Sequence, residues 1–276
     1  MSAAPPVLPP VSGVSPRDWP APDRAALARA RELLGRTSLA VRFANLVGAP
    51  LERGFQLLPA NWRATVQHAT DTALKAALRV AVGSLPSRAG GRPSNRLHRL
   101  LAGTSGALGG AFGFSALPAE LPVSTTLMLR SIASIAASEG HDLRDPETRL
   151  ECLQVFALGG VTETEARSEQ SYWLVRAGLA QALRNATAAL AAGSLSLELT
   201  PPVVQWMARI AARFGVVVSQ QAAAKAVPVL GAVAGAAVNV AFTEHFQRLA
   251  EAHFILRRLE KVHGAGTVHA AFHAAR

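Results

Sequence analysis

The sequence predicts an all-α fold, a multi-helix bundle with two glycine-rich helices packed closely at its centre. Half of the 276 residues are hydrophobic, mostly Ala, Val and Leu. Chains rich in Ala and Leu favour helices, because Ala loses no side-chain entropy on becoming helical. No stretch alternates β-branched and polar residues, so β-strands have little support. Two long segments, 100–119 and 226–243, contain no charged residue and are punctuated by glycines.

The N-terminal third predicts a leader followed by helices. Residues 1–22 are rich in Pro and lack a basic region followed by an apolar one, so we expect a disordered leader and no signal peptide. Residues 23–84 predict a helical N-terminal extension. Its first helix is expected to be capped by Asp23. A second helix is expected from about Asn61 to Val82, where apolar residues recur every three to four positions.

A linker rich in Gly, Pro, Ser and Arg is predicted at 85–96, and one helical domain at 97–264. We expect Pro118 and Pro122 to divide the first charge-poor segment, because proline removes a backbone donor and clashes with the preceding turn. A helix should then begin near Pro122 and end near Glu139.

Caps predict the remaining helices of this domain. Asp145 is expected to cap a helix that has Pro146 at its first position and ends at Gly159 and Gly160. A capping box at 162–165 should open the next helix. Further helices are expected at about 162–192, 201–226 and 228–262, with a C-terminal tail at 265–276.

Two stretches of the chain carry a family resemblance. Residues 120–136 read ELPVSTTLMLRSIASIA, and residues 139–160 read EGHDLRDPETRLECLQVFALGG. Together with PVLGAVAGAAVN at 228–239 they resemble the EcsC family, and the resemblance spans about 97–264. Further residues that carry it are Phe242, His245, Phe246, His253, Phe254, Arg257, Arg258, Leu259 and Glu260.

The EcsC resemblance implies a bacterial, α-helical protein with a link to an ABC-transporter operon. It implies no established activity. The resemblance therefore supports the helical prediction and leaves the biochemical role to the residues themselves.

The charge balance indicates an acidic partner. The net charge is +10, and nearly all of the positive charge is Arg. Such a balance fits an anionic membrane surface or nucleic acid. The Arg residues are dispersed, aromatic residues are scarce and no nucleic-acid-binding module is visible, so nucleic acid is the less favoured partner. The single cysteine, Cys152, cannot form an intramolecular disulfide, which fits a reducing cytoplasm.

No familiar catalytic pattern occurs in the chain. There is no His-Glu-x-x-His zinc helix and no Gly-x-Ser-x-Gly nucleophile elbow. The glycine-rich run at 103–113 fits neither common phosphate-binding pattern. Cys152 lies among apolar residues of a predicted helix, and we expect it to be a small buried hydrophobe.

Isolated charges form the first part of the candidate site. Glu120 and Arg130 are the only charged residues of segment 100–138. Burying either without a partner would be costly. We expect them either to form a polar site in an apolar groove or to pair with one another or with Asp142 and Asp145 as a structural network.

Polar residues near the C-terminus form its second part. His245 and His253 are eight residues apart on one predicted helix, about 80° from alignment, which makes a shared metal awkward. His253 and Glu260 share a face, but two ligands make no site. We expect each His to pack beside a Phe and to hydrogen-bond across the bundle, and Asn239 to bond to another helix. No metal or cofactor is expected.

Small residues at four-residue spacing predict close helix packing. The same spacing recurs in membrane helix pairs, and a membrane-inserting hairpin is the alternative to a buried core. The prolines, Glu120 and Asn239 favour the buried core. The glycines concerned are Gly106, Gly109, Gly110, Gly113, Gly231 and Gly235.

Two hypotheses for function follow. The first is a non-enzymatic binding or accessory protein, cytoplasmic, that acts on a membrane-protein partner or on the inner membrane face, peripherally or by insertion. The alternative is a hydrolase-type enzyme with an unrecognised polar site, which requires Glu120, Arg130, His245 and His253 to converge on one pocket.

Overall fold

The structure is a computed structural model that describes residues 18–35, 39–83, 85, 113–160, 170–192, 200–227 and 231–274. All regular structure in these residues is helical, which confirms the predicted all-α class. The elements are α1 (Ala21–Leu34), α2 (Leu39–Val47), α3 (Leu51–Leu57), α4 (Trp62–Gly83), the 3₁₀ helix η2 (Gly113–Ala116), α6 (Leu117–Ser138), α7 (Pro146–Leu158), α8 (Gln170–Ala191), α9 (Pro201–Ala226), α10 (Gly231–His263) and α11 (Ala265–Ala274).

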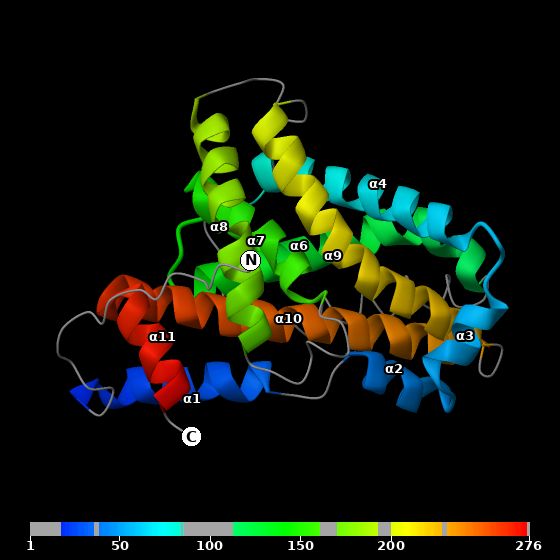
Figure 1. The fold of residues 1–276 in the computed structure, drawn as a ribbon, viewed down its shortest axis with the longest axis horizontal. Helices are drawn as coiled ribbons and strands as arrows, with labels where there is room; N and C mark the ends of the chain where they lie inside the picture. Colours follow the sequence, from blue (N-terminus) through cyan, green and yellow to red (C-terminus); the bar gives the residue numbers. More distant parts are fainter. Residues whose placement is uncertain are drawn as a thin grey trace, which may run out of the picture.

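Helix α10 runs through the middle of the bundle (Figure 1). Helices α1 and α2 pack along one side of it, α6 and α7 pack along another, and α11 packs near its C-terminal end. Helix α4 packs against α6 and α9, and α9 also contacts α3, α7 and α8. The bundle therefore has α1 and α2 at one edge, α10 inside and α4 at the opposite edge, while α9 crosses from the side of α4 to contact α2 and α3.

Local signals set several helix ends. The Asp145 carboxylate caps α7, accepting hydrogen bonds from the Glu147 backbone N–H at 3.0 Å and the Thr148 hydroxyl at 3.1 Å. Helix α9 begins directly after Thr200. Helix α10 is followed by Gly264, whose φ of 83° suits a residue without a Cβ. These ends are the ones that the sequence predicted.

Helix α6 differs from its prediction. It begins at Leu117 and runs through Pro118 and Pro122, which were expected to divide the chain. Pro118 lies in the first turn, where a backbone N–H has no acceptor within the helix. Pro122 forgoes one hydrogen bond, while the added turn buries Leu117 and Leu121. Burial of two Leu side chains offsets the lost bond.

Three helices were not predicted individually, namely α2 and α3, which lie within the predicted helical extension at 23–84, and α11. Helix α11 occupies most of the expected C-terminal tail and buries Val268 and Phe272. Isolated helices this short are marginal, so packing stabilises them more than propensity does. Asp23 does not cap α1, which starts after Pro20, but lies in its first turn.

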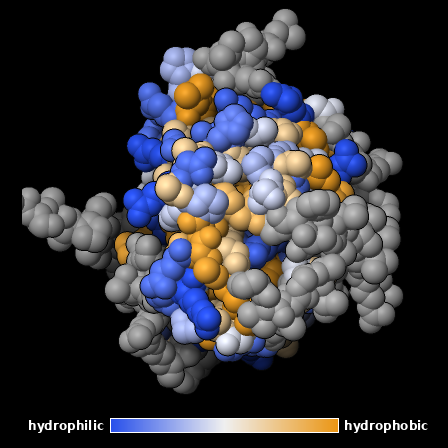
Figure 2. Space-filling model, turned by 90° about the vertical axis from the view of Figure 1, so that its right-hand side faces the viewer, coloured by the Kyte–Doolittle hydropathy of each residue, from blue (hydrophilic) through white to orange (hydrophobic). Residues whose placement is uncertain are grey.

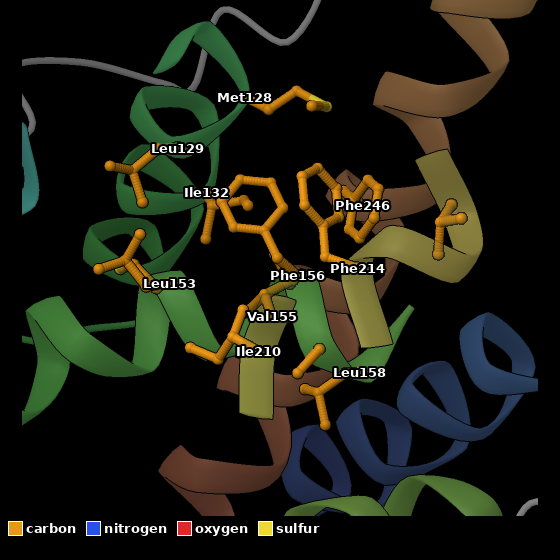
Figure 3. Packing of buried hydrophobic residues seen from close by; sticks show 14 of the residues in the cluster. Met128, Leu129, Ile132, Leu153, Val155, Phe156, Leu158, Ile210, Phe214 and Phe246 are labelled. Atoms are coloured by element: carbon orange, nitrogen blue, oxygen red, sulfur yellow. The ribbon is translucent and has the colours of Figure 1, made fainter. Parts of the chain in front are cut away.

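Four helices meet around an aromatic core (Figure 3). The ring centroids of Phe156 from α7, Phe214 from α9 and Phe246 from α10 are 5.0–5.7 Å apart. Met128 and Ile132 bring α6 to the same cluster. Full burial of such a side chain contributes about 1.5–3 kcal/mol. The helices on either side of the cluster are thereby fixed relative to α10.

The closest helix contacts use glycines that were not predicted for this role. A Cβ on Gly54 in α3 would lie 2.1 Å from the Ala223 carbonyl oxygen in α9. One on Gly160 would lie 2.1 Å from the Arg213 carbonyl oxygen. The backbones of α3 and of the chain that follows α7 therefore pack directly against the backbone of α9.

Other predictions fall partly outside the described residues. Gly113 belongs to η2, Gly231 begins α10 and Gly235 is buried in it. The described residues include no helix that is both long and apolar enough to span a membrane. Outside the described residues lie Gly106, Gly109, Gly110, the capping box at 162–165, and most of the predicted leader and linker.

Candidate functional site

A buried ion pair joins α6 to α9 at one end of the bundle. The Lys225 ammonium lies 2.8 and 2.7 Å from the two carboxylate oxygens of Glu120. Only 1% of the Lys225 side chain and 7% of the Glu120 side chain are exposed. Burial lowers the pKa of Lys225, and the carboxylate opposes that shift. Each charge is therefore held in the interior by the other.

Two amides extend this pair into α10. The Asn239 side-chain amide donates to a Glu120 carboxylate oxygen, and the Gln221 amide donates to the Asn239 oxygen at 2.8 Å. Gln221 and Asn239 are both buried. The network thus connects α6, α9 and α10 through an ion pair and hydrogen bonds between buried polar side chains. We call Glu120, Lys225, Asn239 and Gln221 the Glu120 network.

The structure does not bring Glu120 and Arg130 together, or join them to Asp142 and Asp145 in the expected network. Arg130 is exposed on α6. Asp142 pairs with Arg144 at 2.8 Å on the surface, and Asp145 caps α7. Glu120 lies in the first turn of α6, so its partner comes from α9, which passes that end of the bundle.

A second polar cluster lies between α8 and α10. Tyr172 and Arg176 of α8 face His253 and Glu260 of α10. The Tyr172 hydroxyl is 2.9 Å from Nδ1 of His253, and Arg176 binds both carboxylate oxygens of Glu260, one of them at 2.7 Å. Burial lowers the pKa of His253 and raises that of Tyr172 to about 12. His253 is therefore a neutral core residue.

Arg257 connects this cluster to α7. Its guanidinium lies 2.9 Å from Glu147, 2.5 Å from Glu151 and 3.3 Å from Glu260. Burial raises the pKa of Glu151 to about 7, against the pull of Arg257. Arg257 therefore gathers carboxylates from two helices. We call Tyr172, Arg176, His253, Arg257, Glu260, Glu147 and Glu151 the Arg257 cluster.

His245 lies apart from His253. Its ring packs against Gly159 and lies 5.3 Å from the ring of Phe246. Burial is the main reason that its pKa falls to about 3. The ring of His253 lies 5.0 Å from Phe254. Each His thus packs beside a Phe, as expected, but the two histidines lie in different parts of the core.

The residues that the hydrolase hypothesis needs to converge are dispersed. Three of them lie in separate parts of the core, namely Glu120, His245 and His253, and Arg130 is exposed. The described residues contain no group of three or more potential metal ligands. A hollow of about 220 Å³ between α4 and α9 is lined by other, mainly apolar side chains, including Leu74, Leu78, Val203 and Met207. The geometry is that of structural networks that hold helices together.

The comparison with protein families covers the same helices. A model of the EcsC protein family matches residues 26–259. The chain belongs to the EcsC protein family. This match begins in α1, so the EcsC region includes the helices that were predicted to be an N-terminal extension. No curated protein and no solved structure matches the chain.

The EcsC match includes the Glu120 network and every residue of the Arg257 cluster except Glu260, which directly follows it, and the match stops before α11. Helices α1 and α4 share the core with α6, α9 and α10. The chain from α1 to α10 is thus one packed unit over the described residues. Helix α11 lies beyond the match, where it covers α8 and α10 with Phe272.

Several residues of the two networks were missed from the sequence. Lys225 is one of only three lysines, and it stands in a helix without acidic residues, which was the available signal. Arg257 stands in the stretch that carries the family resemblance. The sequence gives no sign that three other residues point inward, because polar residues at the surface of a helix would give the same pattern. These residues are Tyr172, Arg176 and Glu151, and only the packing of the helices shows where they point.

Proposed function

We propose that this EcsC protein is a non-enzymatic binding protein that docks on the anionic inner face of a bacterial membrane. The observation that carries the proposal is the uneven distribution of charge between helices. We call the side formed by α4, α8 and α9 the basic flank.

The basic flank holds the excess positive charge. Among the described residues, α4, α8 and α9 carry eight Arg or Lys and one acid, Asp71. The remaining described residues carry twelve Arg or Lys against thirteen Asp or Glu. The imbalance therefore belongs to one side of the molecule, because α4 forms the edge opposite α1 and α9 packs against both α4 and α8 (Figure 1).

Most of these cations face outward. Arg176 and Lys225 point inward to Glu260 and Glu120. The exposed ones are Arg63, Lys75, Arg79, Arg184 and Arg209. A Lys or Arg near an anionic leaflet contributes about 1 kcal/mol to binding, and the attraction falls off within a Debye length of about 8–10 Å. Several cations on one side would therefore support salt-sensitive binding.

The polar networks support a binding role over catalysis. Their carboxylates and cations bind one another, and burial holds His253 and the separate His245 neutral. A surface role fits the exposed cations of the basic flank.

Vesicle sedimentation tests the proposal. We expect the chain to bind vesicles of phosphatidylcholine and phosphatidylglycerol at least about tenfold more tightly than phosphatidylcholine alone, and to be released at high salt, since screening weakens exposed charges. Binding of equal strength to both vesicles, or no binding to the anionic ones, would contradict the proposal.

A further inference from the structure

Exposed apolar side chains gather at one end of the molecule. The described residues include seven large hydrophobic side chains that are at least 37% exposed. Four of them lie on α2, α3 and the start of α6. Figure 2 faces this end and shows hydrophobic residues between hydrophilic ones. We call Val41, Leu46, Leu57 and Val123 the apolar end; they are 46%, 37%, 50% and 54% exposed.

Helix α2 carries apolar side chains on two sides. Leu39, Phe43 and Val47 are buried against the bundle, while Val41 and Leu46 point outward. A hollow of about 510 Å³ lies beside Val41, lined by α2 and by the turn into α3. Asn45 is also exposed on this helix, and Arg42 pairs with Glu244 of α10 at 2.8 Å, so α2 is amphipathic. Val41 and Leu46 are the large apolar side chains that its packing leaves exposed.

Cations flank the apolar end. Arg53 on α3 and Arg63 at the start of α4 are exposed and lie before and after Leu57 along the chain, and Glu52 is an exposed acid next to Arg53 in the sequence. Arg63 also belongs to the basic flank, so the two surfaces adjoin. Trp62 is half-buried beside Phe55, with ring centroids 5.6 Å apart. Apolar side chains bordered by Arg and Trp are the composition that interfacial membrane segments use.

We propose that the apolar end inserts into the head-group region of an anionic bilayer, with Leu57 and Val123 entering the acyl boundary. This inference rests on the proposed function and deepens it by naming the part of the chain that enters the membrane. The bilayer is favoured over a second copy of this chain, because identical cationic patches would face one another in a symmetric dimer.

Matched substitutions test which end inserts. Val123→Asp places a charge at the apolar end, and Val262→Asp places the same charge on α10, where Val262 is 65% exposed. With the anionic vesicles, we expect Val123→Asp to weaken binding about tenfold, because a charge replaces an inserted apolar side chain. Val262→Asp should change it by less than about twofold. Leu57→Asp repeats the test if Val123→Asp fails to fold by circular dichroism.

Fluorescence quenching gives a second measurement. Brominated lipid should quench the unaltered chain, and Trp62→Phe should remove a large part of that quenching. Anionic binding that Val123→Asp and Leu57→Asp leave unchanged would overturn the inference and leave the proposed function standing. Failure of the unaltered chain to bind would sink both. A dimer that Val123→Asp dissociates, with vesicle binding unchanged, would also overturn the inference, because the apolar end would then join two copies.

Discussion

At the scale of single residues, burial determines the chemistry of the histidines. His245 has its Nε2 buried beside Gly159, and its pKa is lowered to about 3. In the unfolded chain the same imidazole titrates near 6.5. The unfolded state therefore takes up a proton between pH 6.5 and 3 that the folded state does not. The stability that the neutral His245 contributes is complete above pH 6.5 and declines as the pH falls.

His245→Gln should flatten this pH dependence. Between pH 7 and pH 5, the unaltered chain should lose about 2 kcal/mol more free energy of unfolding than the variant, as measured by urea denaturation at each pH. His68→Gln is the control, because His68 is exposed on α4. Equal losses in the unaltered chain and in His245→Gln would show that His245 is accessible to protons in the folded state.

Sequence reasoning found individual polar residues better than their partners. Glu120 and Asn239 are conspicuous because each stands in an apolar stretch, and the structure joins them in one network. Lys225 is 105 residues away from Glu120 along the chain. Spacing along one helix cannot reveal such a pairing, so Arg130 was considered instead. The partner depends on which helix passes the first turn of α6.

At the scale of helices, some elements are specified by local sequence and others by tertiary packing. The capped helix α7 and the long helices α4, α9 and α10 could be predicted, because their caps and apolar spacing are encoded locally. Helices α2, α3 and α11 could not, because short helices depend on what they pack against. The early start of α6 likewise depends on the burial of Leu117 and Leu121.

The Glu120 network should hold three helices together. Lys225→Met leaves the Glu120 carboxylate buried without its cation, so we expect a loss of about 3–5 kcal/mol in the free energy of unfolding. The double variant Glu120→Gln/Lys225→Met should lose less than the two single variants combined, because no unpaired charge remains.

Arg144→Met is the control for this experiment. It removes the ion pair with Asp142, in which the two side chains are 72% and 48% exposed. Exposed pairs contribute little to stability, because water screens the two charges. A loss of similar size for Lys225→Met, or strict additivity in the double variant, would mean that the Glu120 network does not hold the helices.

At the scale of the whole molecule, the fold separates charge. Carboxylates and cations on α1, α7 and α10 pair with one another, as in the Arg257 cluster and in the contacts of Asp23 with Arg258 and His263. In the part of α4, α8 and α9 that the structure describes, Asp71 is the single acid. The net charge of +10 was evident from the sequence, but dispersed Arg residues concealed which side carries the excess within the described residues. The helix arrangement was needed to locate it.

The most direct test of the central claim compares two charge reversals of equal size on anionic vesicles. Lys75→Glu/Arg209→Glu alters the basic flank, and Arg29→Glu/Arg144→Glu alters exposed cations on α1 and before α7. Both change the net charge by the same amount. The account predicts that the first variant binds at least about tenfold more weakly than the second in vesicle sedimentation. Equal weakening by both variants would contradict it, since net charge alone, and no particular surface, would then govern binding.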